Sequence, residues 1–316
     1  MTVLREQQLP LGGRLRAYAK LAKLSFYDYY LCVFVVWALL DESARTSPRT
    51  FAVLLLFDLG WVGVVAATVT LDDVTGYRDG SDDRNYAPGA VLRDRARKPL
   101  LNGSLTVGQA LRFGYAAALW GTLCWAAAIL VAPHRPVVAI AAAAFSVLIS
   151  VQYSYGLRLS YRGGQELVIL LSTGLCVLIP YWLLAGELNG LALLESFLFG
   201  LWSLLVSVYS NVNDVEGDRA AGRRNLATLV SPGTYGVLIG LLTLLEPVAI
   251  VITLVAGAAP LWFGLFLLPV LALRVRQVNA GLVRNQPLAA RKLGITAHRT
   301  GVVVLVAANL LVLYVR

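Results

Sequence analysis

Long apolar stretches separated by shorter polar segments dominate the chain. Nine of them are candidates to cross a bilayer, because a spanning helix needs about 20 mostly apolar residues. The candidate spans cover residues 27–40, 51–71, 110–132, 136–154, 166–185, 190–210, 233–256, 260–273 and 297–315. The first and eighth are short, and would extend into their flanks or lie partly in the interface. We therefore predict an all-α integral membrane protein, in which residues 1–316 form one bundle of nine transmembrane helices.

The positions of the basic residues test this count, because cytoplasmic loops are enriched in Lys and Arg. With nine spans, 23 of the 27 Lys and Arg residues fall on the side of the N-terminus. The other side holds only Arg45, Arg49, Arg135 and Arg316. This separation predicts an odd number of spans in the cell membrane, with the N-terminus in the cytoplasm.

Composition supports the membrane interpretation, since 58% hydrophobic and 14% charged residues is not a soluble balance. The net charge of +9 follows from the basic cytoplasmic loops, some of which would face anionic lipid head groups. These basic residues are spread over five loops without a nucleic-acid-binding motif, so nucleic acid is not an expected partner. The three cysteines lie inside apolar stretches without paired spacing, which predicts buried thiols rather than a disulfide or a metal site.

A first carboxylate cluster follows the second span. Its members fall within twelve residues and are Asp72, Asp73, Asp79, Asp82 and Asp83. Asp72, Asp79 and Asp83 would share one face of a continuing helix, because separations of seven and eleven residues are close to whole turns. Gly76 and Gly80 argue against such a continuation.

A second cluster follows the sixth span. Asn211, Asp214 and Asp218 are separated by three and four residues, so they project from one helical face. Both clusters fall on the predicted cytoplasmic side of the bilayer. The sequence therefore predicts a central cavity that opens to an Asp-rich cytoplasmic cap.

These clusters supply oxygen ligands without histidine or thiolate partners, a set typical of Mg²⁺ completed by water and substrate phosphate. The alternative is a set of solvated loop charges, but two clusters at the membrane edge on one side favour a function. Basic residues that could neutralise a phosphate lie nearby: Arg78, Arg97, Lys98, Arg158 and Arg162. Metal, cations and an apolar cavity together suit the ionisation of a lipid diphosphate.

The segment from Asn211 to Leu229 resembles the second Asp-rich motif of the UbiA superfamily of intramembrane prenyltransferases, in its menaquinone and chlorophyll branch. The matching positions are Asn211, Asp214, Asp218 and Gly222. Asn225 stands where a threonine is usual. The resemblance covers most of the chain and implies nine helices and two Asp-rich motifs that hold a diphosphate through Mg²⁺.

The segment from Asp72 to Gly80 resembles the first motif of this family less completely. Asp73 and Gly80 match, whereas Asp72 replaces an asparagine and Gly76 replaces the second aspartate. Asp82 follows as in the menaquinone branch, and Asp79 would supply the missing ligand. The metal ligands that the resemblance implies are Asp73, Asp79, Asp82, Asn211, Asp214 and Asp218, and Asp72 joins the expected catalytic residues.

Three further segments resemble the family's basic elements. Lys98 to Gly103 is similar to its Arg-Pro-x-x-x-Gly element, and residues 153–166 are similar to a Tyr and Arg-Gly stretch after the fourth helix. Lys23 stands where many members have an arginine. The residues expected to bind diphosphate are therefore Lys23, Arg78, Lys98, Arg158 and Arg162.

The resemblance implies that an isoprenyl diphosphate, from geranyl to geranylgeranyl or longer, loses its diphosphate and leaves an allylic carbocation in a water-poor chamber. Aromatic faces can stabilise this cation. Candidate chamber residues are Tyr27, Trp61, Tyr153, Tyr181, Trp202 and Tyr209, although interfacial anchoring or helix packing is the commoner role for any one of them. Asp58 lies fourteen residues before Asp72, about 20 Å deeper on the same side of the helix. It would contact the acceptor or abstract a proton, or would be a protonated carboxyl hydrogen-bonded to a neighbouring helix.

The leading hypothesis is transfer of the prenyl group to an aromatic or other hydrophobic acceptor. The alternative is a UbiA-type terpene cyclase, in which the substrate's own double bonds attack the cation. A transporter or lipid-binding scaffold would instead place polar residues near the midplane of the bilayer. No sequence feature specifies the acceptor, the prenyl chain length or the oligomeric state.

Overall fold

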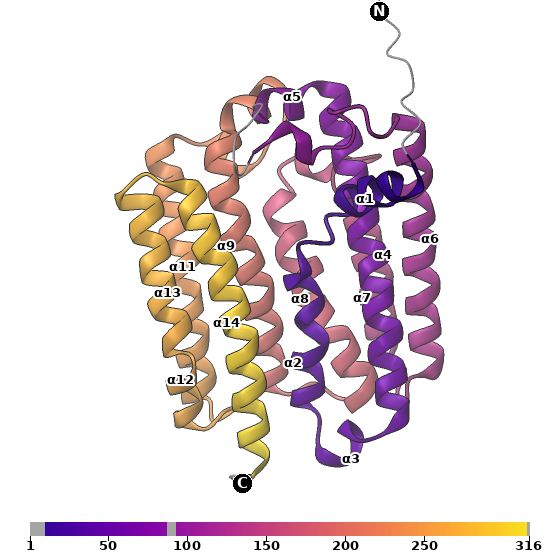
Figure 1. Ribbon diagram of the computed structural model, residues 1–316. Helices are drawn as coiled ribbons and strands as arrows, with labels where there is room; N and C mark the ends of the chain where they lie inside the picture. The colour runs from indigo at the N-terminus through magenta and orange to yellow at the C-terminus, as the bar shows by residue number, and fades with distance from the viewer. Residues whose placement is uncertain (1–9, 87–92, 315–316) are drawn as a thin grey trace, which may run out of the picture.

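The computed structural model describes residues 10–86 and 93–314 and is built from helices. Six of the described helices are long and apolar enough to cross a bilayer. They are α4 (Pro48–Asp79), α6 (Val107–Val131), α8 (Gln165–Ala185), α9 (Gly190–Ala220), α11 (Pro232–Val255) and α14 (Pro287–Tyr314). They run alongside one another as a bundle (Figure 1). The prediction of an all-α membrane bundle is confirmed to this extent.

The other three predicted spans are shorter or divided. The first consists of the 3₁₀ helix η1 (Tyr27–Leu31) and α2 (Cys32–Leu39), and the fourth is α7 (Val137–Val151). The eighth is divided between α12 (Leu261–Phe266) and α13 (Leu268–Val278). The count of nine crossings therefore remains a prediction.

Short elements connect the long helices at the two ends of the bundle. They are α1 (Leu11–Leu21), α3 (Glu42–Arg45), α5 (Ser81–Asn85), η2 (Arg95–Arg97), η3 (Leu159–Tyr161), α10 (Leu226–Leu229) and η4 (Asn279–Val283). Helices α1 and α5 lie at one end, while α3 and α12 lie at the other (Figure 1). The chain reaches the end of α14 on the side opposite α1, as an odd number of crossings requires.

Helices α4 and α6 pack with their backbones in direct contact. A Cβ atom on Gly63 would lie 2.8 Å from the carbonyl oxygen of Ala117, and one on Gly121 would lie 2.8 Å from the carbonyl oxygen of Gly60. Helices α8 and α9 approach similarly, since a Cβ atom on Gly200 would lie 2.4 Å from the carbonyl oxygen of Leu170. Close contact through small residues is a main way of packing helices in lipid, where the hydrophobic effect does not hold them together.

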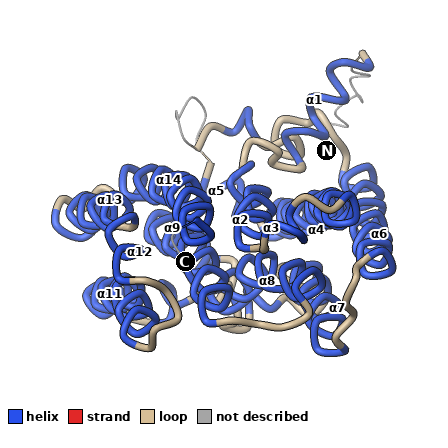
Figure 2. Tube along the Cα trace, turned by 90° about the horizontal axis from the view of Figure 1, so that it is seen from below, coloured by secondary structure: helices blue, strands red, loops and turns tan. Residues whose placement is uncertain are grey.

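Seen along the helices, α11, α13 and α14 lie to one side of the molecule and α4, α6 and α7 to the other (Figure 2). Helices α2, α8 and α9 join these groups, because α14 contacts α9 and α2 while α8 contacts α7 and α9. All three cysteines are buried and free, as predicted. The bundle is thus two packed groups of helices with a shared central layer.

Buried charges in the α11 to α14 group are paired with one another. Nε of Arg274 lies 2.8 Å from Oε2 of Glu246, and the indole of Trp202 donates to Oε1 of Glu246 at 2.7 Å. Both charged side chains are almost fully buried. Neither residue lines the central cavity, so this pair belongs to the packing of the bundle.

Candidate active site

A cavity of about 530 Å³ lies among α4, α8 and α9 and opens toward the loops that carry the Asp-rich segments. Each helix contributes one face. On α4 this face consists of Trp61, Val65, Thr68, Val69 and Asp72, which recur every three or four residues. Asp72 lies eleven residues from Trp61, or about 16 Å along the helix, so a carboxylate faces the mouth and an indole lies deep in the cavity.

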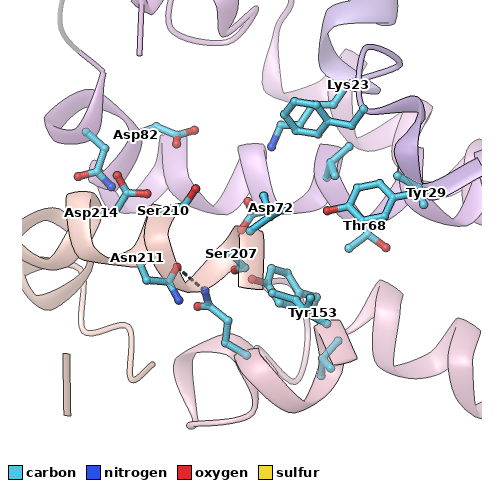
Figure 3. Close-up of a pocket in the computed structure, with 18 of the residues that line it drawn as sticks. Lys23, Tyr29, Thr68, Asp72, Asp82, Tyr153, Ser207, Ser210, Asn211 and Asp214 are labelled. Carbon is cyan, nitrogen blue, oxygen red and sulfur yellow. Dashed lines mark hydrogen bonds between the residues drawn. The ribbon is translucent and has the colours of Figure 1, made fainter. Parts of the chain in front are cut away.

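Helix α9 lines the opposite wall in the same manner. Ser207, Ser210, Asn211, Asp214 and Asp218 all face the cavity, because α9 continues without a break from its apolar part to Ala220. Figure 3 shows Asp214 and Asn211 across the cavity from Asp72, with Tyr29, Thr68 and Tyr153 gathered at the other end of the view. The cavity therefore changes from charged at its mouth to aromatic and hydroxyl-bearing within.

Two lysines bind the carboxylates of α4 and α5. Nζ of Lys98 lies 2.8 Å from Oδ1 of Asp73 and 2.7 Å from Oδ1 of Asp82, and Nζ of Lys23 lies 3.1 Å from Oδ1 of Asp73. Burial lowers the pKa of Lys98, but the carboxylates of Asp73 and Asp82 outweigh it and raise this pKa well above its usual value. Burial also raises the pKa of Asp82 to about 6, against the lowering effect of Lys98. Lys98 is therefore a permanently charged ammonium between two acids.

Gly76 explains how Asp82 reaches this position. Helix α4 runs through Gly76 and ends at Asp79, where Gly80 adopts a left-handed conformation with φ of 75°. The chain then folds back as α5, and a Cβ atom on Gly76 would lie 2.8 Å from Cγ of Asp82. The carboxylate of Asp82 thus occupies space that a side chain at position 76 would need.

Arg223 links the two carboxylate clusters. Its Nη2 donates to Oδ1 of Asp72 at 3.0 Å, and its Nε lies 3.8 Å from Oδ1 of Asp218. Ser154 also donates to Oδ1 of Asp72, at 2.6 Å. Gly222 directs Arg223 inward, because its positive φ of 74° ends α9 in a turn closed by the bond from the Arg223 amide to the Asp218 carbonyl at 2.8 Å.

The α9 residues are held by neighbouring polar side chains. Nη2 of Arg93 lies 2.8 Å from Oδ2 of Asp214. Asn225 caps the N-terminus of α10 and also donates to Oδ2 of Asp218 at 2.8 Å. Asn225 therefore supports Asp218 from the position where the resemblance led us to expect a threonine.

Asn211 is held from α8. Its Oδ1 accepts from Gln165 at 2.9 Å, as the dashed line in Figure 3 marks, and its Nδ2 donates to Oε1 of Glu166 at 3.4 Å. Oε2 of Glu166 is buried and has no hydrogen-bond partner among the described residues. The α8 contacts fix the orientation of the Asn211 amide at the cavity wall.

Among the described residues, seven basic side chains line the cavity: Lys20, Lys23, Arg93, Arg97, Lys98, Arg223 and Arg291. Of the five predicted diphosphate-binding residues, Lys23 and Lys98 are among them. Our reasoning missed Arg223, although a glycine directly after an acidic helical face is a signal for such a turn. It also missed Arg291, which lies in α14 and is far along the chain from both acidic clusters.

Three predicted cations and two predicted metal ligands, Asp73 and Asp79, lie outside the cavity lining. Arg78 and Arg162 are exposed. Arg158 lies over the ring of Tyr161 at 3.8 Å and 3.6 Å from Oδ2 of Asp79. Asp79 also accepts a hydrogen bond from the hydroxyl of Tyr161. Asp79 lies two turns beyond Asp72 on the same helical face, as predicted. At Asp79, however, this face contacts Tyr161 of the loop after α7 instead of the cavity.

Only some of the residues predicted to line the chamber do so. Trp61 and Tyr153 line the cavity, as does Tyr29, which was not predicted. Tyr209 is not among the lining residues, because its ring is buried against η4, where a Cβ atom on Gly281 would lie 2.1 Å away. Asp58 does not line the cavity either, and its Oδ1 is buried without a hydrogen-bond partner in the described part of the chain.

The bundle and its polar mouth define a multi-pass membrane protein with an acidic and basic site at one end of a central chamber. The sequence pattern described as the UbiA prenyltransferase family matches residues 30–298. The chain therefore belongs to the UbiA prenyltransferase family. No curated protein matches the chain in a sequence search.

Solved structures support the fold. An apo UbiA homologue from Aeropyrum pernix K1 has a TM-score of 0.66 and 16% identity, covering 90% of this chain and 96% of that one. A UbiA homologue from Archaeoglobus fulgidus bound to DMAPP and Mg²⁺ has a TM-score of 0.61 and 15% identity, covering 95% and 99%. A structure reported for digeranylgeranylglyceryl phosphate synthase in membranes has a TM-score of 0.61 and 15% identity, covering 94% and 99%.

Proposed function

We propose that this protein ionises an isoprenyl diphosphate in the membrane and transfers the prenyl group to a hydrophobic acceptor. The observation that carries this proposal is the cavity itself, in which seven described cations and carboxylates from both acidic clusters line one chamber together with aromatic and apolar residues. Family membership and the DMAPP and Mg²⁺ bound by the Archaeoglobus fulgidus homologue support it. The substrate would place its diphosphate at the mouth and its prenyl chain beside Trp61.

The residues of α9 fit a Mg²⁺ ion. Asp214 and Asp218 supply two carboxylates and Asn211 an amide oxygen on one cavity-facing side, and Mg²⁺ needs few protein ligands because water and phosphate complete its shell. When bound there, Mg²⁺ would neutralise the charge that develops on the leaving diphosphate. Among the described residues, no group of three or more acidic, histidine or cysteine side chains is arranged to hold a metal ion.

The α4 and α5 carboxylates do not fit a metal ion in the same way. Asp73 and Asp82 are already bound by Lys98, and Asp79 points away from the cavity. We therefore propose that the metal binds at α9, with Asn211, Asp214 and Asp218 as its protein ligands. Asp72 lines the cavity and holds Arg223, which makes it a positioning residue for a phosphate-binding guanidinium.

The chain's cations bind the diphosphate and hold it as it leaves. The C–O bond breaks with both electrons on the diphosphate oxygen, and Arg223, Lys23 and Lys98 surround the place where that charge gathers. Arg223 is suited to this role because a guanidinium binds phosphate through two parallel N–H bonds. The acceptor's electron pair then forms the new bond to the allylic carbon, and the acceptor releases a proton.

The chamber wall favours transfer over cyclisation. Tyr29, Trp61 and Tyr153 present aromatic rings, which stabilise an allylic cation. However, hydroxyl groups of Thr68 and Ser207 share the same wall, among others. A cyclase must protect a carbocation through several steps and needs a drier wall, whereas hydroxyls suit the binding of a second substrate.

We propose that the chain crosses the cell membrane nine times and that the mouth of the cavity faces the cytoplasm.

The test uses the full-length protein in detergent with Mg²⁺ and geranyl, farnesyl or geranylgeranyl diphosphate. Diphosphate release and hydrocarbon products are measured with and without aromatic acceptors. We expect release that depends on an acceptor and yields a prenylated product. A cyclic terpene formed without an acceptor would establish the cyclase instead, and no release with any of these substrates would overturn both.

Asp83→Asn is the matched control for any acidic substitution at the site. Asp83 belongs to the first cluster in sequence, but it is exposed and paired with Arg95 at 2.8 Å outside the cavity lining. Release should be unchanged in this variant and lost in Asp214→Asn. An equal loss of diphosphate release in both variants would show that the reaction depends on the overall negative charge of this end of the protein rather than on carboxylates in the cavity.

A further inference from the structure

We propose that the ammonium of Lys98 replaces a divalent metal ion at the α4 and α5 carboxylates, so that a metal binds only on the α9 side of the cavity. This inference rests on the proposed function for the α9 metal, but its own evidence is the arrangement around Lys98. The Lys98 ammonium contacts the carboxylates of Asp73 and Asp82 directly, and it therefore occupies the position between them that a metal ion would need.

The contacts of Lys98 are those of a bridging cation. Its Nζ lies 2.8 Å from Oδ1 of Asp73 and 2.7 and 2.8 Å from the two carboxylate oxygens of Asp82. The Lys98 side chain is only 6% exposed and that of Asp73 only 2%. A Mg²⁺ ion bound by both carboxylates would need the space between them, and the ammonium fills that space.

The second cluster differs at this point. Arg93 binds one oxygen of Asp214, and Arg223 approaches Asp218 at 3.8 Å, so neither guanidinium joins the two α9 carboxylates. The Arg93 side chain is also more exposed, at 16%. The α9 carboxylates can thus exchange a cation for a metal, while Asp73 and Asp82 share one buried ammonium.

Gly76 makes the lysine arrangement possible. An aspartate there would add another carboxylate near Asp73 on α4, but even its Cβ atom would lie 2.8 Å from Cγ of Asp82. Without a side chain at position 76, Asp82 approaches α4 closely enough to share Lys98 with Asp73. The absence of an acid at position 76 and the contact of Asp82 with Lys98 are therefore linked.

Lys98 retains the capacity to bind substrate. An ammonium has three N–H donors. Asp73 accepts from one of them and the two oxygens of Asp82 from the others, and Lys98 lines the cavity, so a phosphate oxygen would replace one of the two Asp82 oxygens. A fixed cation would then meet one end of the diphosphate, and the α9 metal the other.

Counting bound Mn²⁺ by electron paramagnetic resonance tests this inference on the full-length protein with inorganic pyrophosphate. Lys98→Met removes the ammonium and keeps an apolar stem. We expect this variant to bind one more Mn²⁺ per chain than the wild type, and the double variant with Asp82→Asn to lose that ion again. Lys98→Arg should not gain the ion, because it keeps the charge.

Lys292→Met is the control, since Lys292 is exposed and lies outside the cavity lining. It should bind as many Mn²⁺ ions as the wild type. No additional Mn²⁺ in a folded Lys98→Met variant would overturn the inference. If that variant does not fold, Asp82→Asn alone decides, because its loss of a Mn²⁺ ion would show that the wild type already holds a metal there.

This count separates the inference from the proposed function, because it requires no turnover. Absence of diphosphate release with the expected Mn²⁺ counts would reject the enzyme activity alone. Release that depends on Mg²⁺, together with a wild-type Mn²⁺ ion lost in Asp82→Asn, would reject the lysine replacement alone.

Discussion

Both carboxylate clusters contribute side chains to the same cavity, but they are built differently. The α9 cluster lies on one uninterrupted helical face, and its acids are held from outside by Asn225 and Arg93. The first cluster is divided between α4 and α5, and Lys98 joins its two parts. The two acidic motifs look alike in the sequence. In the structure the α9 cluster presents its carboxylates to the cavity, whereas lysine binds the carboxylates of Asp73 and Asp82.

This difference shows that the number of acids in a motif does not determine how many of them face the cavity. The first cluster has more carboxylates, yet Asp79 and Asp83 are paired outside the cavity and Asp73 is enclosed by lysines. The α9 cluster has fewer but presents them to the cavity. Substitutions in the two clusters should therefore have unequal effects.

Asp214→Asn should have the largest effect. Removing one of two carboxylates on the α9 face should lower the rate of diphosphate release by about 10²–10³-fold, the scale seen for losing one charge-stabilising group. The measurement is the steady-state release of diphosphate at saturating Mg²⁺. Glu216→Gln on the same helix is the control, because Glu216 is exposed and lies outside the cavity lining. Equal rates in both variants would contradict the role of the α9 face.

Arg223→Met should lower the rate by about 10–100-fold, because it removes the cation that links Asp72 to Asp218 and leaves Asp72 without its guanidinium partner. Release of diphosphate measured against substrate concentration separates binding from the chemical step. Arg224→Met provides the comparison, since Arg224 is exposed. A pronounced loss in Arg224→Met and none in Arg223→Met would reverse the assignment.

Gly76→Ala should reduce activity about tenfold and destabilise the protein by about 1–3 kcal/mol, because the added methyl displaces Asp82 from Lys98. Thermal unfolding followed by fluorescence and diphosphate release measure the two effects. Gly233→Ala is the control, since no heavy atom lies within 4 Å of a Cβ atom placed there. A Gly76→Ala variant as stable and active as the wild type would show that Asp82 can move freely.

Arg162→Ala should have the smallest effect, changing diphosphate release by less than about twofold, as exposed substitutions usually do. Arg162 is exposed and does not line the cavity, although its sequence context resembles a diphosphate-binding element. The same assay applies, with Lys23→Met as the contrasting variant. A loss in Arg162→Ala comparable to that in Lys23→Met would place this loop at the substrate.

The parts of the molecule that could be predicted from the sequence depend on regular helical geometry. Hydropathy located the long spans, and the spacing of Asn211, Asp214 and Asp218 placed them on one face because α9 continues unbroken to Ala220. Where a helix ends, the spacing of residues along the chain no longer predicts which side chains lie together. After Gly80 the chain reverses, and Asp82 returns to Gly76 through a contact that no spacing encodes.

The cations were the hardest residues to assign from sequence, since long side chains reach the cavity from separate segments. Arg291 comes from the last long helix and Arg93 from the segment before η2, and neither lies near an acidic motif along the chain. Arg158 and Arg162 lie close to a recognisable motif but bind or face elsewhere. Their placement follows from tertiary packing rather than from neighbours in sequence.

The direct backbone contact of α4 with α6 has a consequence for how this protein could change its substrate. Because Gly63 and Gly121 leave no room for even a methyl group, the distance between these helices is fixed by the main chain. The width of the chamber wall on this side cannot be adjusted by enlarging or reducing residues at the seam. A change in prenyl chain length would have to arise inside the chamber, at positions such as Trp61 or Thr68, where a smaller side chain lengthens the space without separating the helices.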